Sequence, residues 1–110
     1  MASVWHVAAG LSGASAVAAG AYGAHGFKPQ KDSYKVVFET GNRYHLVHSA
    51  LLGIAPMAKR PHVVGTLASL GILAFSGSCY VAALTENREM GKLAPVGGFA
   101  LIGAWLALAI

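Results

Sequence analysis

The sequence predicts an all-α integral membrane protein, a single domain over residues 1–110 built as an antiparallel, up-down-up-down bundle of four helices. Two observations carry this prediction. Charged residues make up only 11% of the chain, whereas a soluble domain usually carries about 25% charge. The apolar residues are also gathered into four stretches, and a helix needs roughly 20 residues to cross the hydrocarbon core of a bilayer. A chain with so little charge cannot cover a water-facing surface.

Short connections separate the expected helices. Because Asp is a favoured N-cap residue, Asp32 is the candidate cap of the second helix. Pro61 and Pro95 mark the starts of the third and fourth helices, since proline suits the first helical turn. Connections of about seven, four and nine residues force neighbouring helices to run antiparallel. The approximate ranges are 4–25, 33–57, 62–85 and 95–110.

The first expected helix has an unusual composition, because between Val4 and Tyr22 it holds many alanines and glycines but a single leucine. Small residues gain little from lipid, whereas small faces let helices approach closely. We therefore expect this helix to pack against neighbours rather than to face lipid broadly. The alternative is that membrane helices are simply rich in glycine and alanine. The stripes of small residues are Gly10-Ala14-Ala18, Ala16-Gly20-Ala24, Ala74-Ser78-Ala82 and Ala100-Ala104.

Basic residues predict partners and orientation. The net charge of +4 comes without the basic runs and interleaved aromatic residues that bind nucleic acid. We therefore expect membrane lipids, and protein partners in a membrane complex or homo-oligomer, but no nucleic acid. Positive charge at helix ends favours the cytoplasmic side, which places the first and third connections in the cytoplasm or the mitochondrial matrix. The charges on that side are Lys28, Lys31, Lys35, Arg88 and Lys92, against Lys59 and Arg60 on the other.

The second expected helix has a polar and an apolar side, at about 100° of rotation per residue. A charge near a helix centre costs roughly 2.5–3.5 kcal/mol in a bilayer, so the polar side should face the sister helices. The expected lipid-facing residues are Val36, Val37, Tyr44, Val47 and Leu51. With one histidine from the end of the first helix, the polar side forms the candidate functional polar cluster: His25, Glu39, Asn42, Arg43, His45, His48 and Ser49.

Glu39 and Arg43 are expected to form an ion pair. The acid lies four residues before the base, which is the favoured order on a helix. Pairing brings no net charge into the membrane, and both side chains lie close enough to the helix start to snorkel. The plainest interpretation of the cluster is therefore an interfacial polar patch that fixes the second helix in the bundle. We expect His25 to meet Glu39 or Asn42.

Three ligand-binding interpretations compete with this one. His45 and His48 could bind a metal with His25, although His25 lies some 10–16 Å shallower at about 1.5 Å per residue. Bis-histidine haem needs a second histidine at matching depth, and the third and fourth helices hold none beyond His62 at the rim. A proton or ion path through Glu39, His45 and His48 has no ionisable group to continue it. Motifs for catalysis or phosphate binding are missing from the sequence, so we predict no enzyme, no cofactor and no bound metal.

Three blocks of residues resemble the family of transmembrane protein 256, which includes small bacterial inner-membrane proteins of unknown function. The blocks are Tyr22-Gly23-Ala24-His25-Gly26, Asn42-Arg43-Tyr44-His45-Leu46-Val47-His48-Ser49 and Leu93-Ala94-Pro95-Val96-Gly97-Gly98. Two further segments, 27–30 and 74–80, resemble the plant or algal branch. The resemblance implies four membrane helices and, for a eukaryotic member, the mitochondrial inner membrane. It implies no activity.

We therefore expect a non-catalytic structural or accessory subunit of a larger membrane complex, such as a respiratory complex. A small oligomeric transporter of ions, protons or solutes that uses the polar face of the second helix is the alternative. Metal or haem binding through His45 and His48 is a further one.

Overall fold

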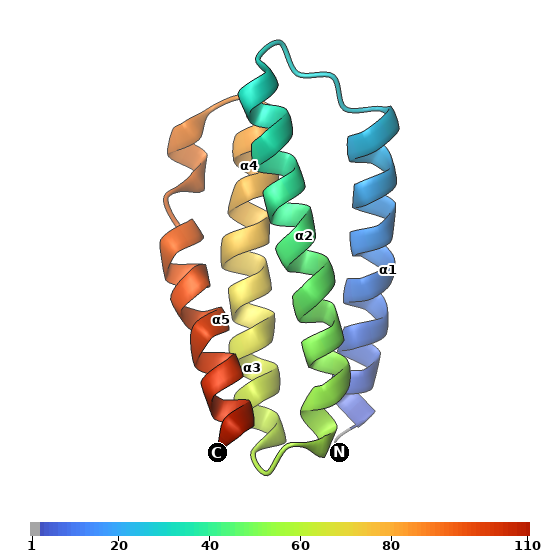
Figure 1. The fold of residues 1–110 in the computed structure, drawn as a ribbon, viewed down its shortest axis with the longest axis vertical. Helices are drawn as coiled ribbons and strands as arrows, with labels where there is room; N and C mark the ends of the chain where they lie inside the picture. Colours follow the sequence, from blue (N-terminus) through green and yellow to red (C-terminus); the bar gives the residue numbers. More distant parts are fainter. Residues whose placement is uncertain (1–2) are drawn as a thin grey trace.

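Residues 3–110, described by a computed structural model, are helical apart from short connections (Figure 1). The all-α prediction is therefore confirmed for this part of the chain. α1 and α2 are long and regular. The third long helix consists of α3 and α4 joined by a π-helical turn, and the fourth is α5. Their bounds are Ser3–His25 for α1, Asp32–Ile54 for α2, Pro61–Gly71 for α3, Ile72–Ser76 for the π turn, Gly77–Thr85 for α4 and Ala94–Ala109 for α5.

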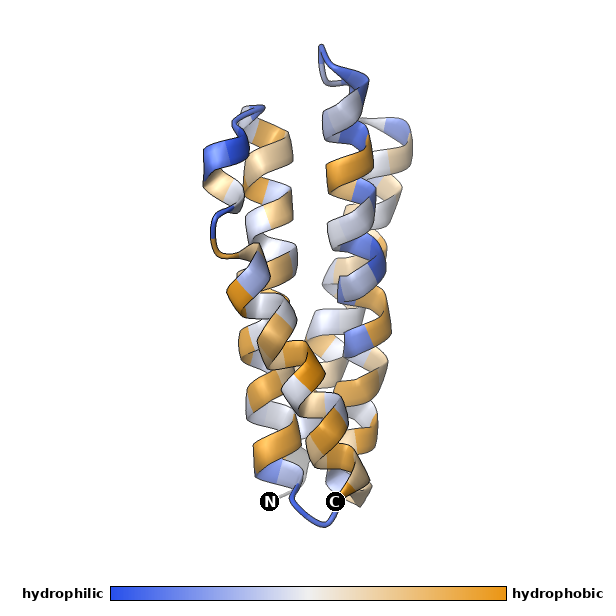
Figure 2. Cartoon of the chain, turned by 60° about the vertical axis from the view of Figure 1, so that its left-hand side comes forward, coloured by the Kyte–Doolittle hydropathy of each residue, from blue (hydrophilic) through white to orange (hydrophobic). Residues whose placement is uncertain are grey.

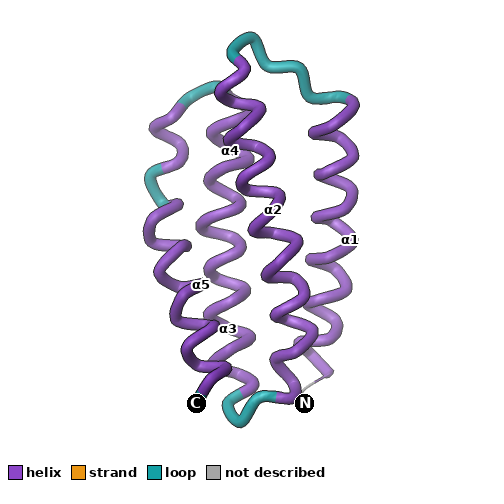
Figure 3. The backbone as a smooth tube through the Cα atoms, in the orientation of Figure 1, coloured by secondary structure: helices purple, strands orange, loops and turns teal. Residues whose placement is uncertain are grey.

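The two chain termini lie at one end of the molecule, together with the connection between α2 and α3 (Figure 1). The other two connections begin at the opposite end. The tube in Figure 3 shows loops at these two ends and a short bend just before α5, further down the side of the bundle. Two short 3₁₀ helices, Ala55–Met57 and Arg88–Gly91, belong to these end regions. Hydrophilic residues gather at the end that holds residues 26–31 and 86–93, and they also run part of the way down α2 (Figure 2).

Three helical segments are long and apolar enough to cross a membrane: Val4–His25, Pro61–Thr85 and Arg88–Ala109. α2 has 23 residues, as many as α1, and is therefore about 35 Å long at about 1.5 Å per residue. It is not among the three, because polar residues interrupt its apolar stretch. α2 therefore differs from the other long helices in its polar residues and not in its length.

The helix starts agree with the prolines but not with the proposed cap. Pro61 is the first residue of α3, and Pro95 follows Ala94 in the first turn of α5. The prediction that Asp32 caps α2 is wrong: Asp32 is the first helical residue, and the cap residue Lys31 makes no side-chain cap bond. The Glu86 carboxylate instead accepts the backbone N–H groups of Gln30 and Lys31, each at 3.3 Å.

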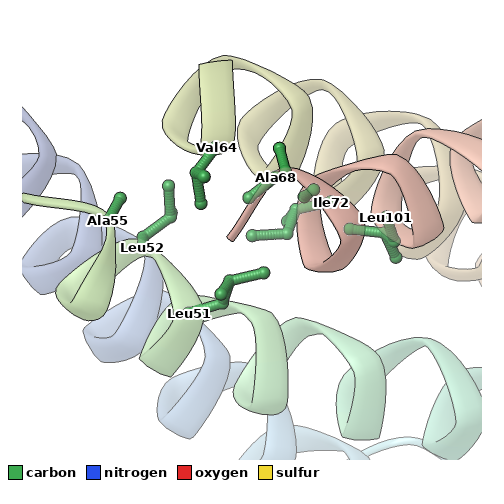
Figure 4. Close-up of a cluster of buried hydrophobic side chains, with 9 residues drawn as sticks. Leu51, Leu52, Ala55, Val64, Ala68, Ile72 and Leu101 are labelled. Carbon is green, nitrogen blue, oxygen red and sulfur yellow. The ribbon is translucent and has the colours of Figure 1, made fainter. Parts of the chain in front are cut away.

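Two apolar clusters form the core, one toward each end of the bundle. The cluster near the termini joins α2, α3 and α5 (Figure 4), and consists of Leu51, Leu52, Ala55, Val64, Ala68, Ile72, Leu101, Ala104 and Ala107. The cluster at the opposite end consists of Phe27, Tyr34, Phe38 and Ala83. Leu51 was expected to face lipid, and this is wrong: it is fully buried, because α3 and α5 cover that side of α2 at this end. Val36, Tyr44 and Val47 are exposed as expected.

The small residues of α1 play a narrower role than expected. Within residues 4–25 only Ala16 and Gly23 are buried, and the stripe Gly10-Ala14-Ala18 faces outward. The prediction that α1 is packed among several neighbours is therefore wrong. α1 packs mainly on α2, where Gly23 accommodates the Phe38 ring: an added Cβ would meet that ring at 2.5 Å. The stripes on the third and fourth long helices do face inward, with Ser78, Ala82 and Ala104 buried.

The π turn lies where α5 crosses the third long helix, and Gly97 makes the closest approach. A Cβ at Gly97 would lie 2.3 Å from the backbone nitrogen of Phe75, within the turn. A backbone atom cannot move aside as a flexible side chain can, so this contact requires glycine. At the next residue, Gly98, an added Cβ would meet Phe75 Cδ1 at 4.0 Å, an ordinary van der Waals distance.

The adjacent glycines give a matched test of this packing. We expect Gly97→Ala to lower the free energy of unfolding by about 1–3 kcal/mol, as overpacking of a tight core does. Gly98→Ala should be neutral or stabilising, because alanine favours helix over glycine by about 1 kcal/mol. Denaturant-induced unfolding in detergent micelles, followed by circular dichroism, measures both. Equal effects of the two substitutions would contradict the close approach at Gly97.

Candidate functional site

A hydrogen-bonded group of three side chains links α1, α2 and α4 halfway along the bundle. The Asn42 amide donates to the Ala16 carbonyl oxygen at 2.8 Å and to the Tyr80 hydroxyl oxygen at 3.1 Å. His45 Nδ1 lies 2.8 Å from the same hydroxyl. The Tyr80 hydroxyl oxygen accepts from Asn42, and His45 Nδ1 is the acceptor within residues 3–110 that lies in reach of the hydroxyl hydrogen, so we assign the Tyr80 hydroxyl as the donor to His45 Nδ1. His45 therefore carries its proton on Nε2.

Serine hydroxyls surround the other side of the His45 ring. The Ser49 hydroxyl donates to the His45 carbonyl oxygen at 2.6 Å, so it accepts from the Ser12 hydroxyl, which lies 2.6 Å away. The Ser15 hydroxyl donates to the Ser12 carbonyl oxygen at 2.9 Å. Each of these hydroxyl hydrogens is thus engaged within the protein. His45 Nε2 contacts Ser15 Oγ at 3.4 Å and also faces the Ser12 carbonyl oxygen. The Ser15 contact is longer than the roughly 2.7–3.2 Å of an ordinary N–H···O bond.

His48 belongs to a different environment. Its Nδ1–H donates to the Tyr44 carbonyl oxygen at 2.7 Å, and its Nε2 accepts from the Trp105 indole N–H of α5 at 3.0 Å. The ring is buried, and both nitrogens are occupied in the neutral form. His45 and His48 therefore face different helices, and no group of three His, Cys, Asp or Glu side chains within residues 3–110 is arranged to hold a metal.

The remaining members of the predicted cluster lie outside it. Glu39, Arg43 and His25 are exposed, and the ion pair formed within the described part of the chain is Lys92–Glu89, at 3.8 Å. The predicted Glu39–Arg43 pair is therefore wrong. An exposed pair at this spacing gains only about 0.2–0.5 kcal/mol, too little to hold both side chains together. The expected contact of His25 is also wrong: within residues 3–110 it forms no ion pair with Glu39, and the Asn42 amide is instead bonded to Ala16 and Tyr80.

Glu39 and Arg43 border a shallow hollow of about 300 Å³ along the outer seam between α1 and α2. Gly20 and Gly23 form its wall on α1. Arg43 is 11 residues from the start of α2, hence about 16 Å along an axis of about 35 Å. A guanidinium group at the middle of this helix is thus exposed on the surface of the single chain.

A larger cavity, of about 400 Å³, lies on the other side of α1, between α1, α2 and the third long helix. Its lining is mainly apolar, with Leu11 and Leu73 at exposed positions, and none of its residues is Asp, Glu, Lys or Arg. Its polar lining residues are Ser12, Ser15, His45, Ser69, Ser76 and Tyr80.

Sequence reasoning missed the partners of α2. Tyr80 and Trp105 lie in apolar stretches, where an aromatic residue is most often core or interface material. The Ser12 and Ser15 hydroxyls were hidden among the small residues of α1. A weak signal was available, since a buried tyrosine or tryptophan usually needs a polar partner.

The chain also resembles known proteins along most of its length. Residues 19–98 match the family described as "Protein of unknown function (DUF423)". The chain belongs to this family. Its bacterial relatives are UPF0382 membrane proteins, and the one from Staphylococcus haemolyticus is 37% identical over 86% of this chain and 82% of its own length. Those of Bacillus subtilis and Haemophilus influenzae are 34% and 33% identical, over 86% and 90% of this chain and 84% and 85% of their own lengths. No solved structure matches the chain.

The expected kinship with bacterial membrane proteins is thus confirmed. The matched region contains the three blocks that suggested a known family, from Tyr22 to Gly98. It includes Asn42, His45 and Tyr80, the residues of the central hydrogen-bonded group, and it begins after the serines of α1.

The central group predicts a large stability effect for one hydroxyl. Tyr80→Phe leaves both His45 Nδ1 and one Asn42 N–H without a partner, and each buried unsatisfied group costs about 1–3 kcal/mol. We expect a loss of at least 1 kcal/mol in the free energy of unfolding in micelles. Tyr22→Phe is the control, because Tyr22 is exposed and donates no hydrogen bond within the described residues. An unchanged stability of Tyr80→Phe would show that this network does not hold α2 to α4.

Proposed function

We propose that this protein is a non-catalytic, four-span membrane component that assembles with another membrane-embedded protein through the outer face of α2. The observation that carries the proposal is the position of Glu39 and Arg43, which are exposed and unpaired within residues 3–110. A charge near a helix centre costs about 2.5–3.5 kcal/mol in hydrocarbon, so exposing Arg43 to lipid is expensive, and Glu39 adds a second charge one turn nearer the helix start. A protein partner that offers the opposite charges removes this cost.

Four crossings in alternating directions are part of the proposal. Three segments meet the requirements of a membrane span on their own. α2 has the length of α1 and is joined to its neighbours by short connections. Its uncharged polar residues Asn42, His45 and His48 are hydrogen-bonded to α1, α4 and α5. It can therefore cross the bilayer together with its neighbours, although its composition alone would not support insertion.

The face of α2 that carries the charges is suited to protein contact. Val36, Val47 and Ile54 are exposed beside Glu39 and Arg43, giving an apolar surface with one acid and one base. A second copy of the chain would bring an acid and a base to the same surface, and so would a different subunit with complementary charges. As in the sequence analysis, we propose that the partner is a larger inner-membrane assembly, such as a respiratory complex, in which this chain is an accessory subunit.

Orientation and membrane remain proposals as well. The end with residues 26–31 and 86–93 carries four basic residues, and Lys35 in the first turn of α2 makes five. The connection between α2 and α3 carries two, so we infer that the more basic end lies in the cytoplasm or the matrix. Relation to transmembrane protein 256, to its plant or algal branch and to the mitochondrial inner membrane rests on the resemblance of three sequence blocks. The relatives named above are bacterial.

Transport and metal binding receive less support. A path along the polar face of α2 would need Glu39, His45 and His48 on one side. Instead, Glu39 borders the hollow on one side of the α1–α2 seam, His45 lines the cavity on the other side, and His48 faces Trp105 of α5. The Trp105 indole also occupies the His48 nitrogen that a metal or haem iron would need.

Neutralising the exposed charges tests the assembly. Solubilised from its native membrane in mild detergent, the wild-type protein should migrate on a native gel as a complex larger than the 11.3 kDa chain. Glu39→Gln and Arg43→Gln should release the free chain with unchanged thermal stability, because neither side chain makes an ion pair within the described residues.

The matched controls are Glu89→Gln and Lys92→Gln. These two charged residues form the exposed pair in the connection before α5, where water already solvates them. They should leave the complex intact. A wild-type chain that migrates alone, or control variants that release it as readily, would contradict the proposal.

A further inference from the structure

The cavity between α1, α2 and the third long helix is suited to a ligand that no comparison assigns. It lies beside the central hydrogen-bonded group, with His45 13 residues from the start of α2, about 20 Å along the helix. At that depth the surrounding solvent is hydrocarbon. A volume of about 400 Å³ holds the head and the first carbons of a lipid-like molecule.

The hydrogen-bonding pattern determines what kind of group the cavity can receive. Tyr80 donates to His45 Nδ1, so the ring must carry its proton on Nε2. The neighbouring hydroxyls of Ser12 and Ser15 direct their hydrogens to other atoms of the protein. Among these grouped side chains, His45 Nε2–H is the donor that is held most weakly, because its contact with Ser15 Oγ is 3.4 Å long. The Ser69 hydroxyl also lines the cavity. The cluster calls for a hydrogen-bond acceptor.

The rest of the lining excludes a charged head. No Lys or Arg lines the cavity to neutralise a phosphate or a carboxylate, and its surface is largely apolar. Burying an ion without a partner costs far more than one hydrogen bond returns. Leu11 and Leu73 at the rim are 70% and 71% exposed, so a hydrocarbon tail leaving the cavity would lie against apolar side chains.

We propose that this cavity binds an uncharged amphiphile whose carbonyl oxygen accepts a hydrogen bond from His45 Nε2–H and whose hydrocarbon tail extends into the bilayer. A quinone ring and a fatty ester share this chemistry. The site lies on the opposite side of the seam between α1 and α2 from Glu39 and Arg43, so it is separate from the proposed assembly face.

Three probes separate the two sources. Decylubiquinone supplies a ring with carbonyl groups, methyl decanoate supplies an ester, and decane supplies a tail of equal length without an acceptor. Each is titrated into the purified protein in phosphatidylcholine nanodiscs, and binding is measured as a rise in Tm with probe concentration. At least one carbonyl probe should raise Tm, and the stronger one identifies the class of head. Decane should not raise it.

Two glycines provide a matched pair of variants. A Cβ added at Gly77 or at Gly10 meets nothing within 4 Å, so both positions accept a larger side chain. Gly77 lines the cavity and Gly10 does not. Gly77→Leu should abolish the Tm response to the carbonyl probe, and Gly10→Leu should retain it.

His45→Asn tests the donor directly. Its side-chain oxygen can still accept from Tyr80, but it places no N–H at the former Nε2 position. We expect apparent affinity to fall about tenfold, in line with the loss of one hydrogen bond. In wild-type protein labelled with ¹⁵N-histidine, the His45 Nε2–H resonance should shift on addition of the carbonyl probe. The proposal is overturned if neither carbonyl probe binds, if decane acts equally, or if Gly77→Leu responds like Gly10→Leu.

Discussion

The hydroxyl of Tyr80 is the point on which the middle of this bundle depends. It accepts from Asn42 and donates to His45, and Asn42 also holds the Ala16 carbonyl of α1. One phenol oxygen therefore ties α2 to α4 and, through Asn42, to α1. In the hydrocarbon core of a bilayer, water cannot supply the missing hydrogen bond of an unpartnered polar group. The polar residues of α2 can thus be tolerated because a tyrosine and a backbone carbonyl meet them at the same depth.

Small residues bring these partners within reach. Gly41 lies so close to α4 that an added Cβ would meet Cys79 Cβ at 2.6 Å, and the Ser76 hydroxyl donates to the Gly41 carbonyl oxygen at 2.7 Å. Ser76 is the last residue of the π turn, so the irregular turn and the hydrogen bond to α2 occur together. Such turns are often found at functional positions in helices. Here the turn is adjacent to both the Gly97 contact and the inner cavity.

Residue periodicity was enough to predict four helices and to place Asn42, His45 and Ser49 toward the interior. It could not predict their partners, because the register between α2 and α4 is set by side-chain packing at Gly41 and Tyr80 rather than by spacing along either helix. The spacing of Glu39 and Arg43 permits an ion pair, but the free energy that such an exposed pair gains is too small to hold the two side chains together. The composition of α1 indicated close packing on several sides. In the structure α1 packs closely along one seam with α2, and its remaining small residues are exposed.

The two unusual features of the molecule lie on opposite sides of the seam between α1 and α2. At about 100° per residue, Glu39 and Arg43 fall well away from His45 around α2, and Gly20 and Ala24 fall away from Ser12 and Ser15 around α1. The charged side carries Glu39 and Arg43, which are costly to expose to lipid, so a protein partner is the favoured neighbour there. The cavity side has the weakly held N–H of His45 and a lining without charged residues, which favours a neutral lipid-like molecule. A protein partner and a ligand could therefore occupy the chain together, and a change at one side need not disturb the other.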